Sequence, residues 1–395
     1  MRPLVYGSVC SGIEAASLAW EPLGWRPAFF SQFDPSHDYA KGPDFASAVL
    51  AHRWPHVPNL GDFTKIDGAA WDIDVLVGGT PCQAFSAAGL RRSLDDERGR
   101  LTLSFVRLAH AIRSLRWLVW ENVPDVLSTD DNAFGCFVGG LVGHDDALPA
   151  PRGGRWPHVG MVAGPLARAA WRVLDAQHFR LPQRRRRLFV VASFGAAAGD
   201  PAEILFERKG LPGDFATGLE GWREAAGDVG LGAERDDRAL DLNGYAECVA
   251  FALRGREHGA MAEIEGDRVG TLRAAGGGSS RSYLAFTAKD HGQDCGPISP
   301  TLRSGGFSKS HANGGVMPAV VVETGVRRFT PLECERLMGL PDHHTRIPWN
   351  GKPAELCPDG PRYFVIGNSM AVPVMRWIGA RIELQEQRRR ELKAA

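Results

Sequence analysis

One cysteine stands where a thiol has chemical use. Cys82 lies in the run GGTPCQAFS, residues 78–86, at the end of the strand-like run DIDVLVGG. A thiol at that place is either a small core residue or a nucleophile, because a thiolate attacks carbon when its pKa is lowered or a base assists. No histidine stands near Cys82 in this motif, so the sequence offers no obvious Cys–His pair for acyl transfer.

Two other polar groups also stand at the ends of strand-like runs. Glu121 and Asn122 follow RWLVW, and Gln183, Arg185 and Arg187 precede LFVVA. A buried glutamate can stay protonated and donate that proton, and an arginine can hold an oxygen or a phosphate. Together with a thiolate they suit conjugate addition to a pyrimidine. The thiolate adds to C6, the glutamic acid protonates N3, an arginine holds O2, and C5 becomes nucleophilic enough to take a methyl group.

The first 195 residues alternate strand-like and helix-like runs, and this pattern must position those groups. Expected strands are 4–10, 27–34, 72–79, 116–123 and 186–194, and expected helices are 12–20 and 101–115. The alternation predicts an α/β fold with a doubly wound, mostly parallel sheet. Ligands of such sheets bind beyond the carboxyl ends of the strands. Cys82 is expected at that edge with Ser11, Gly12, residues 32–34 and Glu121.

The composition changes at about residue 196. From 196 to 325 glycine and polar residues increase, and TLRAAGGGSS at 271 is partly repeated as TLRSGGFSKS at 301. Three short strand-like runs, at 247–253, 282–288 and 319–324, favour a folded, loop-rich module over a flexible insertion. Regular structure returns with a helix that Thr330 and Glu333 begin as a capping box, and a last helix spans about 374–392. We therefore expect three parts: 1–195, 196–325 and a return segment, 326–395.

The overall composition excludes several classes of protein. With 395 residues, 44% hydrophobic and 23% charged, the chain resembles ordinary soluble proteins of more than one domain. No run is long enough to span a membrane and no signal-peptide pattern is present, which predicts a cytoplasmic protein. Seven scattered cysteines without C-x-x-C indicate neither a zinc site nor a disulfide framework, so no metal is expected. The net charge of zero argues only weakly against nucleic acid, since arginine clusters at 91–92 and 184–187.

The motifs, taken in order, resemble those of the DNA (cytosine-5) methyltransferases, in a phage or prophage style. GGTPCQAFSAAG resembles their catalytic motif, ENV at 121–123 the motif of the N3-protonating glutamate, and QRRRRLFVV their Q-x-R-x-R motif. The resemblance implies a Rossmann-like methyltransferase fold and a covalent intermediate between Cys82 and C6 of cytosine. The implied catalytic residues are Cys82, Glu121, Arg185 and Arg187.

The resemblance also implies S-adenosyl-L-methionine as cofactor. SGIEAA at 11–16, GDFTKI at 61–66 and IGNSMAVPV at 366–374 resemble the cofactor motifs. The implied cofactor-binding residues are Ser11, Gly12, Ile13, Gln32, Phe33, Asp62, Phe63, Leu101, Asn368 and Ser369. The first motif departs from the family pattern, because Glu14 and Ala15 replace glycines, and we expect Glu14 to point away at a helix start. Gln32 replaces the usual acidic residue for the ribose hydroxyls, and residues 36–44 form an insertion.

The implied partner is double-stranded DNA. Residues 196–325 would form the target-recognition domain, and RRFTPLECERLMGLP at 327–341 resembles the motif that supports it. The target cytosine would leave the duplex for a slot between Cys82, Glu121 and Arg187. Expected DNA contacts are Gln83, Ser86, Arg91, Arg92 and Gln183. A monomer is expected, and a cognate restriction endonuclease is left open as a further partner.

Alternative functions share parts of this pattern. An RNA cytosine-5 methyltransferase has the same architecture but typically a short recognition region, whereas this one spans 196–325. A thymidylate-synthase-like enzyme needs neither the insert nor the S-adenosylmethionine site. A DNA-binding homologue with impaired catalysis would not need Cys82, Glu121 and the arginines together. Amino-methylating DNA enzymes are disfavoured because the chain has no P-P-Y or P-P-F motif.

Overall fold

The structure is a computed structural model, and it describes most of the two outer parts of the chain and short stretches between them. The described residues are 2–80, 100–151, 153–195, 199–206, 250–256, 259–266, 280–284, 301–302, 319–322 and 325–394. Five residues with an expected role lie outside the described residues: Cys82, Gln83, Ser86, Arg91 and Arg92.

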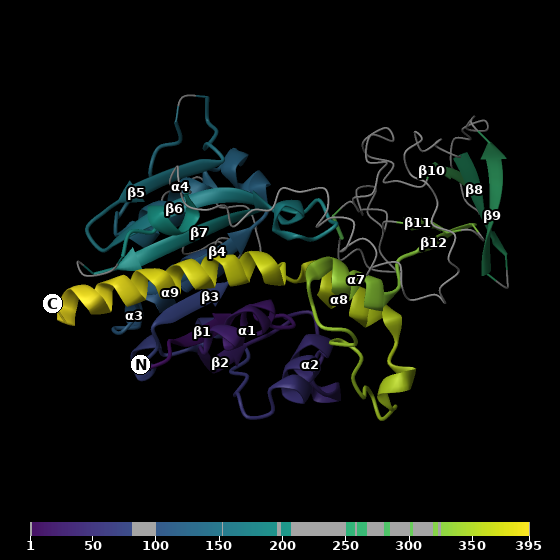
Figure 1. Cartoon of the computed structure of the whole chain (residues 1–395), viewed down its shortest axis with the longest axis horizontal. Helices are drawn as coiled ribbons and strands as arrows, with labels where there is room; N and C mark the ends of the chain where they lie inside the picture. Colours follow the sequence, from purple (N-terminus) through teal and green to yellow (C-terminus); the bar gives the residue numbers. More distant parts are fainter. Residues whose placement is uncertain are drawn as a thin grey trace.

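A seven-stranded sheet forms the centre of the molecule (Figure 1). Its order is β2 (Arg26–Ser31), β1 (Val5–Val9), β3 (Val75–Gly78), β4 (Trp117–Asn122), β7 (Arg186–Phe194), β6 (Ala167–Asp175) and β5 (Val159–Ala163). The first four strands are parallel, and β7, β6 and β5 each run antiparallel to the strand before. Five strands, β1 to β4 and β6, therefore share one direction, and the expected doubly wound, mostly parallel sheet is confirmed.

Helices cover both faces of the sheet because neighbouring strand residues point to opposite sides. Along β4, Trp117 and Val119 belong to one buried cluster, and Leu118 and Trp120 to the other. The first cluster packs on α1 (Ala15–Trp20), α5 (Ala202–Leu205), α7 (Pro331–Met338), α8 (Asp359–Asn368) and α9 (Val372–Ala394). The second packs on α3 (Arg100–Ala111) and α4 (Ala133–Val142).

The remaining helices are short or lie beside these layers. α2 (Phe45–Arg53) begins at Asp44, whose side chain accepts from the Ser47 amide. The 3-10 helices are Glu21–Leu23, Tyr39–Lys41, Phe63–Lys65, Gly68–Ala70, Pro124–Ser128, Ala176–Phe179 and Ala354–Leu356. At α7 the expected capping box is present, with Thr330 and Glu333 each bonding the other's backbone amide.

Five strands are described in the middle part of the chain. β8 (Ala250–Arg256) pairs antiparallel with β9 (Gly259–Gly266) and with β10 (Ser280–Leu284), and β11 (Ala319–Val322) pairs with β12 (Gly325–Arg328). The expected strands overlap β8, β10 and β11, whereas β5, β6, β9 and β12 were not expected. The division of the chain at 196 and 325 stays a prediction.

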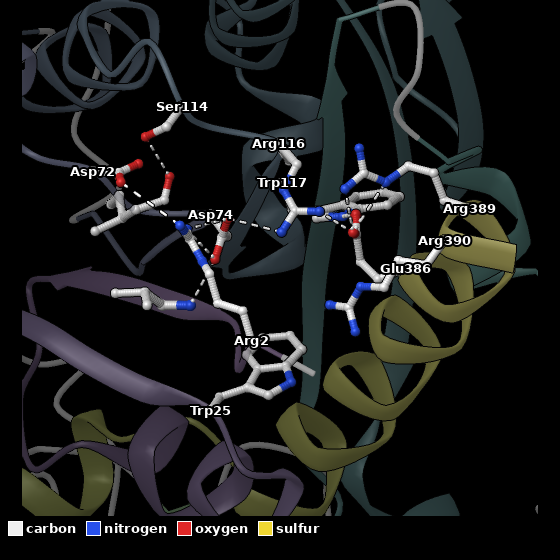
Figure 2. Close-up of polar contacts among 12 residues, drawn as sticks. Arg2, Trp25, Asp72, Asp74, Ser114, Arg116, Trp117, Glu386, Arg389 and Arg390 are labelled. Atoms are coloured by element: carbon white, nitrogen blue, oxygen red, sulfur yellow. Dashed lines mark hydrogen bonds and ion pairs between the residues drawn. The ribbon is translucent and has the colours of Figure 1, made fainter. Parts of the chain in front are cut away.

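The last helix is fixed to the sheet by a buried carboxylate (Figure 2). Glu386 of α9 has no exposed surface, and it accepts from the Trp117 indole N–H at 2.8 Å and from Arg389 at 2.9 Å. It also pairs with Arg116, whose Nη2 lies 2.8 Å from Asp74 beside β3. Ion pairs and a hydrogen bond, as well as apolar packing, therefore hold the C-terminal helix against the beginnings of β3 and β4.

We predict that Glu386→Ala destabilises the protein. Removing the Glu386 carboxylate leaves the buried Trp117 N–H without its acceptor, while Arg116 keeps Asp74 as a partner, and a buried donor without a partner costs about 1–3 kcal/mol. Urea unfolding followed by circular dichroism measures this loss. Glu391→Ala, at an exposed position of the same helix, is the control and should change stability by about 0.5 kcal/mol or less. Equal midpoints for the two variants would contradict the assignment.

Candidate active site

A pocket lies beyond the carboxyl ends of the parallel strands. Its walls come from four places in the chain: the end of β1 with the turn that follows and the start of α1, Gly79 after β3, Glu121 at the end of β4, and residues 368–370 from the end of α8 to the start of α9. The lining residues of the first place are Ser8, Cys10, Ser11, Gly12, Glu14, Ala15 and Ala16. The space amounts to about 410 Å³, part of it open to solvent. Segments from both ends of the chain therefore build one site, at the edge where the sequence analysis expected it.

The antiparallel pairing of β4 with β7 explains why the catalytic candidates meet. Glu121 faces Phe189 and Asn122 faces Leu188 in the register, so β7 begins where β4 ends. Arg187 lies just before Leu188, and its Nε is 3.1 Å from Glu121 Oε1. The structure therefore brings Glu121 and Arg187 together as an ion pair at the pocket.

Burial raises the pKa of Glu121, while the positive charges of Arg187 and Arg185 act in the opposite direction. The side chain is mostly covered, with 12% of its surface exposed. A carboxyl with a raised pKa keeps its proton to higher pH than a free glutamic acid. Glu121 is thus suited to donate a proton to a ring nitrogen that enters the pocket.

Arg185 has a different environment from Arg187. Its guanidinium is buried and donates to three backbone carbonyls: Leu302 at 3.1 Å, Gly367 at 3.2 Å and Ser369 at 2.7 Å. Burial, followed by the charge of Arg187, lowers its pKa to about 9. Ser369 lines the pocket and Gly367 lies two residues before it, so Arg185 is suited to position residues 367–369 at the end of α8.

The Q-x-R-x-R run alternates between interior and surface. Gln183 has no exposed surface, and neither amide atom has a hydrogen-bond partner among the described residues. Arg184 and Arg186 are exposed. Gln183 and Arg185 are thus both buried just before β7, and the expected contact of Gln183 with DNA stays a prediction.

The turn after β1 is held to the end of β2. Ser31 donates its amide to Ser11 Oγ at 3.0 Å, and the Gly12 amide donates to Gln32 Oε1 at 2.9 Å. Gly12 has a φ of +57°, a conformation that favours glycine. Ser11, Gly12 and Gln32 are therefore brought together as expected. Ile13 instead packs in the core, where its carbonyl bonds His344 Nε2 at 2.8 Å.

Glu14 corrects one expectation. The side chain does not point away: it lines the pocket, is 1% exposed, and forms the N-cap of α1. Its carboxylate accepts from Ser17 N at 3.2 Å, from Ser17 Oγ at 2.6 Å and from Ser8 Oγ. Burial raises its pKa to about 7, although these hydrogen bonds oppose the shift. The sequence carried a signal for this role in Ser8 and Ser17, which supply the donors.

The other cofactor candidates fall into two groups. Asn368 and Ser369 line the pocket. Phe33, Asp62, Phe63 and Leu101 do not line it. Asp62 accepts from the Thr64 amide at 3.0 Å, Phe63 is buried, and Leu101 packs partly buried on the second cluster.

The insertion at 36–44 supplies Tyr39, whose ring packs against Phe33. The Phe33 ring is 42% exposed and stacks on Tyr39 with 5.2 Å between the ring centroids and 7° between the planes. The Tyr39 hydroxyl donates to Asp44 at 2.7 Å and accepts from the Asp34 amide at 2.8 Å. These bonds give the segment after β2 a fixed shape.

Comparison with known proteins decides the family. The family model described as C-5 cytosine-specific DNA methylase matches residues 6–138 and 256–384. The chain belongs to this family. Its expected resemblance to the cytosine-5 methyltransferases is therefore confirmed, and the cofactor of the family is S-adenosyl-L-methionine.

Relatives of this chain include phage and bacterial proteins. A protein of Escherichia phage P1 named DNA N-6-adenine-methyltransferase is 39% identical over 99% of this chain and 62% of its own length. The type II methyltransferase M.NlaIV of Neisseria lactamica is 34% identical over 38% of this chain and 32% of its own length. The chain thus spans less than two thirds of these curated relatives.

Solved structures with the same fold support this assignment of the fold. A mutant form of DNMT2 from Spodoptera frugiperda has a TM-score of 0.54 at 14% identity, covering 96% of this chain and 99% of that one. A DNA modification methyltransferase encoded within an E. coli prophage has a TM-score of 0.54 at 18% identity, covering 97% and 99%. At these identities the likeness shows the fold alone.

Two kinds of feature are absent from the part of the chain that the structure describes. No group of three His, Cys, Asp or Glu side chains is arranged to hold a metal ion. Over the same part of the chain, no helix has the length and apolar character to cross a membrane.

The residues of the pocket fit the cofactor. A Cβ on Gly79 would lie 3.3 Å from both Glu121 Oε2 and Met370 Cε, so glycine at this position preserves space for a ligand. The charged groups among the described lining residues are the acids Glu14 and Glu121. S-adenosylmethionine carries a sulfonium and an ammonium, and an acidic lining suits these cationic groups.

We predict that Arg185→Lys weakens cofactor binding by about tenfold, because one ammonium cannot replace the guanidinium at three separate carbonyls. Titration calorimetry with S-adenosylmethionine measures the effect. Arg184→Lys, at the exposed neighbouring position, is the control and should bind like the parent. If a folded Arg185→Lys variant bound S-adenosylmethionine with unchanged affinity, the position of residues 367–369 would not depend on the hydrogen bonds of Arg185.

Proposed function

We propose that this chain is a DNA (cytosine-5-)-methyltransferase that acts on cytosine flipped out of a specific duplex sequence, through a covalent bond between Cys82 and C6. The observation that carries the proposal is the Glu121–Arg187 pair, which a raised pKa and a 3.1 Å contact suit to the roles of proton donor and oxygen-binding group at one pocket wall. Cytosine offers an N3 and an O2 side by side for such a pair.

The segment that leads to Cys82 is attached to the strand of Glu121. The Asn122 side-chain amide donates to the Thr80 carbonyl at 3.1 Å, and the Trp120 indole N–H donates to Thr80 Oγ1 at 2.8 Å. Thr80 is buried and stands two residues before Cys82. These bonds support the proposal because they fix Thr80, two residues before Cys82, to the two residues that flank the proton donor Glu121 on β4.

The proposed chemistry divides between the residues as follows. The Cys82 thiolate adds to C6, Glu121 gives its proton to N3, and Arg187 binds O2 and orients the Glu121 carboxyl. S-adenosylmethionine, when bound, supplies the methyl group. After methylation at C5, a base removes the C5 proton, the C6–S bond breaks as Cys82 leaves as thiolate, and N3 returns its proton to Glu121, which restores the neutral aromatic ring.

Several features favour duplex DNA as substrate. The family model and the phage P1 relative are named for DNA, and residues 196–325 offer room for a target-recognition domain. The name of the phage P1 relative refers to adenine, but this chain spans 62% of that protein, so we assign the adenine activity in that name to the remaining part. RNA stays the alternative substrate. The likeness to the solved DNMT2 structure, at 14% identity, shows the fold alone and does not distinguish an RNA substrate from a DNA substrate.

Incubation with S-adenosylmethionine and duplex DNA containing 5-fluorocytosine tests the proposal. Fluorine cannot leave C5 as a proton does, so a methylating thiolate stays attached to the base. We expect a denaturation-resistant protein–DNA adduct that Cys82→Ser abolishes. An adduct with fluorinated RNA but not with DNA would show that the substrate is RNA and not DNA. No adduct with either nucleic acid would contradict the covalent mechanism.

We predict that Glu121→Gln lowers kcat by a factor of about 10²–10⁴, the usual contribution of a positioned proton donor. In the parent, the protonated form is present below the raised pKa of Glu121 and is lost as the pH rises through it, so that step gives kcat an alkaline decline. The variant should lack this decline. Asp125→Asn, at an exposed acid three residues after β4, is the control and should retain both rate and profile.

A further inference from the structure

The carboxyl of Glu14 lies within the cofactor pocket, and the proposed catalytic steps do not use it. It lies almost wholly beneath the pocket surface, with 1% of its surface exposed. Burying a carboxyl is costly unless hydrogen bonds or a counter-charge compensate. A buried acid in this pocket therefore calls for a role in the site.

The hydrogen bonds of Glu14 come from neutral groups. Its partners among the described residues are the hydroxyls of Ser8, Ser11 and Ser17 and the Ser17 amide, and Ser17 in turn accepts from the Tyr6 hydroxyl at 2.7 Å. These donors fix the carboxyl in the floor of the pocket. They do not neutralise its charge.

The second acid of the pocket differs in this respect. Glu121 is paired with Arg187, whereas Glu14 has no basic side chain beside it among the described lining residues. A cation that enters the pocket would therefore gain most from Glu14, and the attraction would be strong because little water separates the charges.

We propose that Glu14 is the counter-ion of the cationic sulfonium half of the methyl donor, so that the pocket prefers the donor to the neutral thioether product. This inference rests on the proposed function. Both molecules carry the same ammonium and carboxylate, and they differ in charge only at sulfur. Loss of the methyl group removes the positive charge, leaves Glu14 unpaired and favours release of the product.

The pH dependence of binding follows from the burial of Glu14. Its pKa of about 7 means that the carboxyl is neutral in acid and charged above pH 7, and a cation favours the charged form. Donor affinity should therefore increase from pH 6 to pH 8. Of the groups that face Glu14, burial raises the pKa of the Tyr6 hydroxyl well above its usual range and the pKa of the Cys10 thiol to about 12, so both stay neutral in this window.

Two further acids need controls because they lie near the same carboxyl. Glu121 lines the same pocket, and Glu21 follows α1 and acts on Tyr6 beside the Glu14 network. If either caused the pH dependence, Glu121→Gln or Glu21→Gln would remove it. The proposal expects both variants to keep it.

The experiment is titration calorimetry of S-adenosylmethionine and S-adenosylhomocysteine against the parent and Glu14→Gln at pH 6, 7 and 8. At pH 8, Glu14→Gln should weaken the donor by about tenfold and the product by about twofold or less, and the donor affinity should lose its pH slope. Glu14→Asp, which keeps the charge, should keep a preference for the donor even if the shorter side chain weakens the cap of α1.

Equal weakening of donor and product in Glu14→Gln would overturn the inference, since a purely structural cap affects both ligands alike. An unchanged ratio of the two affinities in a folded Glu14→Gln would overturn it as well. A parent that binds neither ligand would contradict the methyltransferase function itself, so the two failures are distinguishable.

Discussion

The change of direction between β4 and β7 is the constraint on which the site depends. β3 and β4 run parallel and end at the same edge, whereas β7 runs antiparallel to β4 and begins there. This single reversal brings the start of β7, just before which Arg185 lies and in which Arg187 lies, to the end of β4 that carries Glu121, beside Gly79 and Thr80 after β3. A fully parallel sheet would put the start of β7 at the opposite edge, away from Glu121.

The return segment completes this edge from the other end of the chain. The Trp20 indole N–H donates to the Met375 carbonyl at 2.8 Å, which joins α1 to the start of α9. Arg185 holds the loop before α9, and Glu386 fixes its far end to β4. α9 runs along the face of the sheet in Figure 1, so a long helix with contacts at both ends positions the loop 368–370. The pocket therefore forms only when the last part of the chain has docked on the first.

Much of this arrangement could be predicted from the sequence because its signals are local. Buried strands such as 75–78 and 117–122 begin with continuous apolar runs, VLV and WLVW, and Thr330 with Glu333 is a recognisable helix start. β5 and β6 were missed because β5 (VGMVA) is short, contains glycine and is half exposed, and because two arginines interrupt the apolar residues of β6 (ARAAWRVLD). Without them the antiparallel half of the sheet was not expected. The roles of Arg185 and Glu14 depend on partners that fold near them, and a buried acid is rare enough that exposure was the natural expectation.

The most direct test of the account identifies the methylated atom. Duplex DNA is incubated with the protein and isotopically labelled S-adenosylmethionine, digested to nucleosides and analysed by mass spectrometry against standards. The account predicts that the label appears in 5-methyl-2′-deoxycytidine. Label in N6-methyl-2′-deoxyadenosine or in N4-methyl-2′-deoxycytidine would contradict it, because methylation of an exocyclic amine requires neither a thiolate at Cys82 nor a proton from Glu121.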